Sequence, residues 1–266
     1  MNLSSQTPRR NARPINSATL IAIASGKGGV GKTWLAVTLC QALARQGRRV
    51  LLFDGDLGLA NVDIQLGLMP ERDLQGVLAG RFSLRGAILP YRPEGSAGFD
   101  LVAGQAGSGS LAGLPVDRLQ ALADRVLALD ADYDHVIMDL GAGVEDTVRQ
   151  LARPAATCLV VTTDEPTSLT DAYAFIKLTQ RDFPETAFKI VVNMAASAQA
   201  GERTYRTLAK ACQSFLGLTP SLAGVIRRDE HVPEAIRHQA PLLTRHPNSP
   251  AATDVARLAD QLGHQP

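Results

Sequence analysis

The stretch ASGKGGVGKTWLAV, residues 24–37, decides the fold that we expect for this chain. It follows a short apolar run, residues 19–24, and opens a segment in which Leu35, Leu39 and Leu43 recur at helical spacing before Gly47. The apolar run predicts a buried strand, and the leucine spacing predicts a helix that ends at the glycine. A glycine-rich loop between a strand and a helix presents backbone N–H groups and the positive end of the helix dipole to an anion. The stretch therefore predicts a phosphate-binding loop.

This loop matches the P-loop pattern, because Gly26 is followed after four residues by Gly31, Lys32 and Thr33. In such a loop the lysine bridges the β- and γ-phosphates of a nucleotide, and the threonine hydroxyl ligates Mg²⁺. The residues expected to contact the nucleotide are Gly26, Lys27, Gly28, Gly29, Val30, Gly31, Lys32, Thr33 and Trp34. For Trp34 the favoured role is packing beneath the loop, and contact with the nucleotide or with a partner is the alternative.

Three aspartates at the ends of apolar runs support this prediction. Asp54 and Asp56 end the run that begins at residue 49, and Asp139 lies in the run at residues 135–140. In an open α/β sheet the carboxyl ends of the strands face the ligand crevice. We therefore expect Asp139 to help hold the Mg²⁺ shell. The alternative is that these aspartates only cap neighbouring turns.

The rest of the chain repeats the alternation of apolar runs and helical segments. About seven nearly continuous apolar runs predict a single α/β P-loop NTPase domain, with a mainly parallel sheet of seven to eight strands and helices on both faces. Residues 19–266 are assigned to this domain and residues 1–18 to a flexible polar tail. Residues 103–113, rich in glycine and serine, are expected to form a mobile loop. Thr167 or Ser168 is the expected cap of the helix that follows residue 166.

Composition excludes several classes of protein. A net charge of +1 with 20% charged residues argues against a globally basic nucleic-acid coat. The three cysteines, Cys40, Cys158 and Cys212, form no CxxC pair, which rules out a four-cysteine or zinc site within one chain. No apolar stretch reaches the ~18–20 residues of a membrane span, and the polar start lacks the core of a signal peptide. We expect a cytoplasmic protein.

Lys27 is not explained by the P-loop alone, because Lys32 already supplies a cation to the phosphates. The sequence GKGGVGKT, residues 26–33, resembles the deviant Walker A motif of the MinD/ParA class of P-loop ATPases. The resemblance implies that Lys27 reaches across a homodimer interface to the phosphates of the partner's nucleotide. There its ammonium would meet an anion when it loses water.

The same resemblance implies roles for further residues, with ATP and Mg²⁺ as cofactors. Asp56 resembles the switch I aspartate that orients the attacking water, and Asp54 resembles the residue that supports the Mg²⁺ environment. The implied metal set is Thr33, Asp54 and Asp139, and the implied catalytic set is Asp56, Lys27 and Lys32. Asn193 resembles the residue that hydrogen-bonds adenine, and the backbone around Arg227 and Asp229 is expected to frame the base. DLGAG, residues 139–143, resembles switch II, but Leu140 replaces the usual threonine and so removes a hydroxyl from γ-phosphate sensing.

Two stretches of the sequence indicate which group within the MinD/ParA class this chain resembles. DGDLGLANVDIQLGL, residues 54–68, and VVTTDEPTSLTDAYAFIKL, residues 160–178, are similar to the MinD-like ATPases that regulate the number and placement of flagella. Such regulators usually end in a basic amphipathic helix that binds membrane. Here the last helix has Val255, Leu258 and Leu262 on one face but only Arg257 as a cation, so we expect it to pack on the domain. The N-terminal tail also lacks the element by which these regulators activate a partner GTPase.

The function implied is that of an ATP-dependent dimerising switch with weak ATPase activity, which positions or limits the number of a cellular structure such as flagella. Its expected partners are a second copy of the chain and proteins of the flagellar or another polar machinery, with recruitment to the cell pole or the inner membrane face. Three alternatives stay open: a nucleotide-binding antiactivator or adaptor that does not hydrolyse ATP, a DNA-binding ParA-type segregation ATPase, and a metabolic enzyme. A stripe of Arg203, Arg206 and Lys210 would serve DNA binding, but a solvated helix face is the simpler interpretation.

Overall fold

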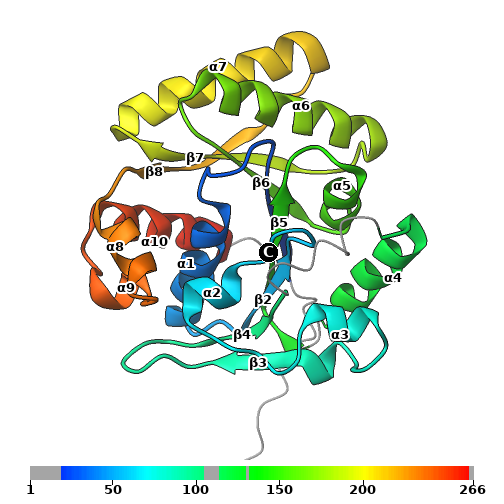
Figure 1. The fold of residues 1–266 in the computed structure, drawn as a ribbon. Helices are drawn as coiled ribbons and strands as arrows, with labels where there is room; N and C mark the ends of the chain where they lie inside the picture. Colours follow the sequence, from blue (N-terminus) through cyan, green and yellow to red (C-terminus); the bar gives the residue numbers. More distant parts are fainter. Residues whose placement is uncertain (1–18, 105–113, 130–131, 264–266) are drawn as a thin grey trace, which may run out of the picture.

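The computed structural model describes residues 19–104, 114–129 and 132–263, and it contains one eight-stranded sheet (Figure 1). The strand order is β3-β4-β2-β5-β1-β6-β7-β8, and every neighbouring pair is parallel except β3 and β4. The strands are β1 (Thr19–Ser25), β2 (Val50–Gly55), β3 (Ile88–Tyr91), β4 (Phe99–Val102), β5 (His135–Ala142), β6 (Thr157–Thr162), β7 (Phe188–Ala195) and β8 (Ser221–Arg227). This confirms the predicted single α/β fold. The predicted tail at 1–18 and most of the predicted loop at 103–113 lie outside the described residues.

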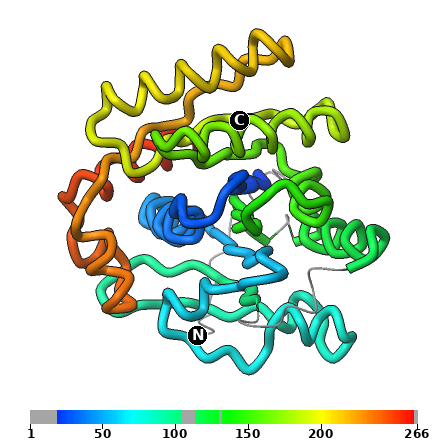
Figure 2. The backbone as a smooth tube through the Cα atoms, turned by 45° about the horizontal axis from the view of Figure 1, so that its top comes forward, coloured from blue at the N-terminus to red at the C-terminus, as the bar shows by residue number. Residues whose placement is uncertain are grey.

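Helices cover both faces of the sheet, because the strands are apolar on both sides. In β1, Ile21 and Ile23 pack with α1 and α10, whereas Ala22 and Ala24 belong to the cluster that α4 to α7 cover. The helices are α1 (Lys32–Arg45), α2 (Val62–Leu66), α3 (Leu74–Leu78), α4 (Val116–Leu127), α5 (Asp146–Ala152), α6 (Pro166–Asp182), α7 (Ala198–Leu216), α8 (His231–Arg237), α9 (Leu242–Arg245) and α10 (Pro250–Gly263). Figure 2 shows α6 and α7 lying side by side at one end of the sheet.

Two local predictions differ from the structure. The cap of α6 is Glu165, not Thr167 or Ser168, because Pro166 takes the first helical position, where its missing N–H costs no hydrogen bond. The Ser168 hydroxyl instead lies 3.0 Å from the Thr162 hydroxyl and accepts a bond from the Thr163 N–H. The sequence pattern also did not predict β3, a four-residue edge strand that pairs antiparallel with β4.

The topology brings the polar strand ends together. The sheet places β1 beside β5 and β5 beside β2, so the P-loop after β1 lies next to the aspartates at the ends of the other two strands. Asp54 on β2 and Asp139 on β5 are direct cross-strand partners. The fold therefore collects two carboxylates beside the start of α1.

Candidate nucleotide-binding site

The loop between β1 and α1 has a backbone that only glycine adopts easily. Gly29 and Gly31 have φ angles of 78° and 88°, in the left-handed region. A Cβ on Gly26 would lie 2.0 Å from the carbonyl oxygen of Asp171 on α6. A Cβ on Gly31 would lie 2.5 Å from the Asn193 amide nitrogen. The loop is therefore held between α6 and β7 in a shape that turns its backbone toward a ligand.

Lys32 and Asp139 form the charged base of the site. Lys32 is 8% exposed; burial lowers the pKa of its ammonium, and Asp139 and Asp56 act in the opposite direction. Burial raises the pKa of Asp139 to about 7, although Thr33 and Lys32 lower it. Among the described residues, neither carboxylate oxygen of Asp139 has a partner in normal hydrogen-bond geometry. Such a buried acceptor without a partner is costly, and a bound cation would satisfy it.

Asp54 adds a second buried carboxylate beside the first. Its side chain accepts hydrogen bonds from the backbone N–H groups of Val62, at 3.2 Å, and of Asp56, at 3.3 Å. Burial, followed by the charge of Asp139, raises the pKa of Asp54 to about 8. In the described part of the chain no group of three His, Cys, Asp or Glu residues is placed to hold a metal. Mg²⁺ is usually held by one or two carboxylates together with phosphate oxygens and water, so Thr33, Asp54 and Asp139 fit that ion beside a nucleotide.

Asp56 is turned into its own loop. Its carboxylate accepts bonds from the N–H groups of Gly58, at 3.2 Å, and Leu59, at 2.9 Å. It also lines a cavity of about 280 Å³ between the loop after β2 and the loop that leads into α5. The structure thus places Asp56 near Lys32, but with its oxygens engaged in a turn.

Lys27 makes contacts that the sequence pattern did not predict. Its ammonium lies 2.6 Å from a carboxylate oxygen of Glu165 and 3.0 Å from the Thr167 hydroxyl, at the start of α6. The Lys27 side chain is 37% exposed and the Glu165 side chain 62% exposed, so the ion pair is at the surface. Both partners lie in the stretch 160–178 that carries the family resemblance, but nothing in the sequence places the start of α6 beside the P-loop.

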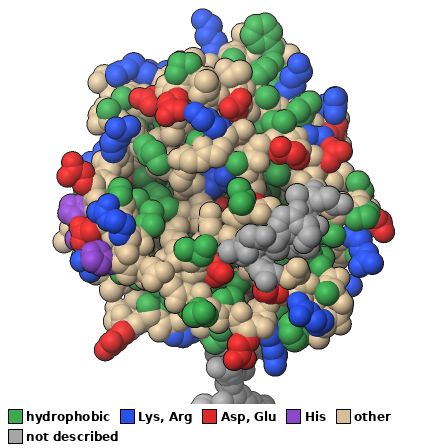
Figure 3. Space-filling view, viewed as in Figure 1, with side chains coloured by type: hydrophobic (Ala, Val, Ile, Leu, Met, Phe, Trp, Pro, Cys, Tyr) green, Lys and Arg blue, Asp and Glu red, His purple; other side chains and the backbone are tan. Residues whose placement is uncertain are grey.

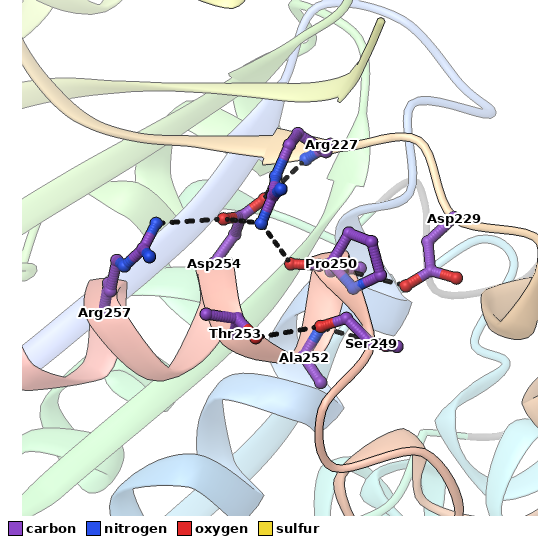
Figure 4. A network of polar contacts seen from close by, with 9 residues as sticks. Arg227, Asp229, Ser249, Pro250, Ala252, Thr253, Asp254 and Arg257 are labelled. Atoms are coloured by element: carbon purple, nitrogen blue, oxygen red, sulfur yellow. Dashed lines mark hydrogen bonds and ion pairs between the residues drawn. The ribbon is translucent and has the colours of Figure 1, made fainter. Parts of the chain in front are cut away.

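The three residues expected near the base are anchored by neighbouring elements. The Asn193 amide donates to the carbonyl oxygen of Val30 in the P-loop, at 2.8 Å. The Arg227 guanidinium pairs with Asp254 of α10 at 2.8 Å, as Figure 4 shows. Asp229 accepts bonds from the N–H groups of Ala251 and His231, both at 3.0 Å. The side chains of Arg227 and Asp229 therefore fix the loop after β8, and only its backbone is left to frame a base.

Burial at Asp229 alone would raise its pKa. The hydrogen bonds from Ala251, Ser249 and His231 outweigh this effect and lower the pKa of Asp229 to about 2. The carboxylate is thus charged at neutral pH and holds the start of α10 against the end of β8.

The remaining expectations concern surfaces outside this site. Trp34 is 6% exposed and lies in the apolar cluster around α1. The α10 residues Val255, Leu258 and Leu262 belong to the same cluster and are at most 2% exposed, so this face of the helix packs on the domain as expected. Within the described residues, no helix is both long and apolar enough to cross a bilayer.

The basic stripe of α7 is a solvated face. Arg206 pairs with Glu202 at 3.0 Å, one helical turn away, and its side chain is 70% exposed. Figure 3 shows lysine and arginine interspersed with aspartate and glutamate over the visible face of the molecule.

Comparisons with known proteins agree with this geometry. Residues 21–242 match the family model described as the CobQ/CobB/MinD/ParA nucleotide binding domain. The chain is 40% identical over 247 residues to the antiactivator FleN of Pseudomonas aeruginosa, covering 93% of this chain and 87% of that protein. It is 30% identical over 244 residues to the flagellum site-determining protein YlxH of Helicobacter pylori, covering 91% and 81%.

Solved structures show the same fold. The cell division ATPase MinD of Pyrococcus furiosus superposes with a TM-score of 0.76 at 25% identity, covering 92% of this chain and 98% of that one. The septum site-determining protein MinD of Pyrococcus horikoshii, solved in complex with Mg-ADP, gives a TM-score of 0.75 at 24% identity, with coverage of 92% and 96%. The chain belongs to the MinD/ParA family of P-loop nucleotide-binding proteins.

Proposed function

We propose that this chain is an ATP-dependent dimerising switch with weak ATPase activity, which sets the position or the number of a cellular structure, with flagella as the first candidate. The observation that carries the nucleotide part is the juxtaposition of Lys32, Asp54 and Asp139 at the mouth of the P-loop. The flagellar part rests on similarity to an antiactivator and to a flagellum site-determining protein.

In this proposal the P-loop N–H groups and Lys32 bind the phosphates, and Thr33, Asp54 and Asp139 hold Mg²⁺, which supplies charge neutralisation when bound. Asp56 leaves its turn with Gly58 and Leu59 and orients the attacking water. The backbone around Asp229 frames the base, and Asn193 bonds adenine.

Lys27 must exchange partners for the dimer to close. In the single chain its ammonium is bonded to Glu165 and Thr167. We propose that these contacts hold Lys27 until the phosphates of a partner's nucleotide replace them, since a charge-assisted bond to phosphate is stronger than an exposed ion pair.

Light scattering tests the switch. We expect the Asp56→Ala variant to have the mass of a monomer with ADP and twice that mass with ATP and Mg²⁺. Adding Lys27→Ala should abolish the doubling, because the trans contact is lost. A monomer under every condition would show that the dimer mechanism is wrong.

The alternative of a non-hydrolysing adaptor is favoured by two observations, the missing hydroxyl at Leu140 and the engaged carboxylate of Asp56. A measurement of phosphate release from ATP distinguishes the ATPase switch from the non-hydrolysing adaptor. We expect slow turnover that Asp56→Ala abolishes; an unchanged background rate in that variant would favour the adaptor. Counting flagella in cells that lack the gene, with Lys32→Ala as the complementation control, tests the cellular role.

A further inference from the structure

A second cleft lies at the end of the sheet opposite the nucleotide site. It has a volume of about 630 Å³ and opens at the amino ends of β2, β4 and β5, beside the edge strand β3. Val50 of β2 lines this cleft, and Asp54 lies four residues further along the same strand, which at ~3.3 Å per residue is a distance of about 13 Å. The cleft is therefore distinct from the ATP site, and the dimer switch does not use it.

Four arginines line the cleft, Arg48, Arg49, Arg85 and Arg92, against two lining aspartates, Asp100 and Asp132. These arginines come from three separate parts of the chain: the turn before β2, the 3₁₀ turn η1 (Arg85–Ala87), and the residue after β3. Their convergence is a product of the tertiary fold, because they are not one charged run in the sequence.

Three of these arginines have carboxylate partners. Arg92 pairs with Asp100 at 2.7 Å, and Arg85 pairs with Asp132. Arg49 pairs at 3.2 Å with Asp134, which lies just outside the lining. The three side chains are 56–58% exposed, so these pairs are solvated and can share their remaining N–H donors.

Arg48 is different. Its guanidinium donates to the backbone carbonyl of Gly263 at 2.9 Å, and it has no carboxylate partner among the described residues. After burial, the charge of Arg48 is the next largest cause that lowers the pKa of His135 on β5. Among the described residues, Arg48 is thus the arginine of the lining that forms no ion pair with a carboxylate.

The shape and the donors of the cleft select a class of ligand. A guanidinium offers up to five N–H groups in a planar fork that matches phosphate oxygens, and the volume is within the ~300–1,000 Å³ of small-molecule sites. Asp100 and Asp132 would repel a long polyanion that ran through the whole cleft. We propose that this cleft binds a small molecule carrying at least two linked phosphate groups, held mainly by Arg48 and Arg49.

Calorimetric titration with inorganic pyrophosphate tests the proposal. The titrated protein is the full chain with Lys32→Ala, in a buffer without Mg²⁺, so that the P-loop does not compete for the probe. We expect one pyrophosphate per chain, bound at least tenfold more tightly than citrate, because the cleft selects phosphate and not only negative charge. No binding, or equal binding of citrate, would overturn the proposal.

Matched variants locate the site. In the same background, Arg48→Ala with Arg49→Ala should weaken pyrophosphate binding at least tenfold. Arg203→Ala with Arg206→Ala, which removes the same charge from α7, should leave it unchanged. An equal loss of pyrophosphate affinity in the two double variants would show that net charge alone attracts the probe. That result would contradict the assignment to the cleft. If Arg48→Ala with Arg49→Ala does not fold, Arg48→Lys with Arg49→Lys replaces it. The lysines keep the charge but lack the planar set of guanidinium N–H donors, so we expect severalfold weaker pyrophosphate binding. Unchanged binding would refute the role of the guanidinium groups.

Discussion

Among single residues, the buried carboxylates of Asp54 and Asp139 make stability depend on pH. Burial raises the pKa of Asp54 to about 8 and that of Asp139 to about 7, from an ordinary value of 3.8. The unfolded chain therefore releases these protons at lower pH than the folded chain does. The stability that they contribute is fully present below about pH 4 and is lost as pH rises through 7 to 8.

We therefore expect the nucleotide-free protein to have a lower Tm at pH 8 than at pH 6. Asp54→Asn should flatten this dependence, because the neutral amide does not titrate. Val62 and Asp56 donate to different oxygens of Asp54, so the single amide oxygen of asparagine can keep only one of these bonds, and we expect the variant to be less stable than the parent at every pH. Thermal unfolding followed by circular dichroism across this range gives the comparison. The same slope in the variant as in the parent would contradict the assignment to Asp54.

The ion pair between Lys27 and Glu165 gives a second prediction at the residue scale. Since both side chains are at the surface, Glu165→Ala should not change the Tm appreciably. It should lower the ATP concentration needed for half-maximal dimerisation severalfold, because Lys27 no longer has to leave a carboxylate. Analytical ultracentrifugation of the Asp56→Ala background measures this. A higher ATP requirement would show that Glu165 assists the dimer instead of restraining Lys27.

At this scale the sequence predicted the P-loop and the aspartates, since their positions follow from a local pattern and from strand ends. It could not predict that Glu165 bonds Lys27 or that Asp56 bonds its own loop. Those contacts depend on how α6 and the loop after β2 lie in space. Asn193 was expected to bond adenine; its contact with Val30 requires β7 beside the P-loop, which only the folded chain reveals.

Among the structural elements, α10 is tied to the end of β8 by a buried carboxylate. The Asp254 side chain is 5% exposed and binds the Arg227 guanidinium and the Arg227 N–H, at 2.8 Å and 3.0 Å (Figure 4). We expect Asp254→Ala to lower the free energy of unfolding by ~1.5–3 kcal/mol, the range for hydrogen bonds to charged groups. Urea denaturation measures the change.

Arg257→Ala is the control for that variant. Its guanidinium is 3.5 Å from Asp254 and its side chain is 70% exposed, so we expect a change within about 0.5 kcal/mol. Equal losses in the two variants would mean that the helix surface, and not the contact with β8, sets the stability.

The elements themselves were largely predictable. Strands buried on both faces are continuous apolar runs, and the amphipathic spacing of α10 correctly indicated packing on the domain. The sequence pattern does not predict the edge strand β3, with the sequence ILPY, because the strand is short and contains Pro90, which argues against a strand. The start of α6 differs from the expected cap because Pro166 takes the first helical position, which moves the cap back to Glu165.

For the whole molecule, a ligand that binds only the folded state should raise its stability. At a concentration 100 times its Kd, ADP with Mg²⁺ should add ~2.7 kcal/mol, which for a domain of this size is an increase in Tm of several degrees. Differential scanning fluorimetry measures it, and Lys32→Ala should remove most of the shift. A shift of full size in that variant would place the nucleotide elsewhere.

The edge strand β3 has a consequence for how the protein behaves in concentrated solution. An exposed edge of a sheet is a template on which another chain can add a strand and begin an aggregate. Here that edge is only four residues long, and Pro90 has no N–H to offer to an incoming strand. The short antiparallel β3 thus offers few backbone groups to an added strand, and we expect the protein to resist polymerisation through that side of the sheet at high concentration.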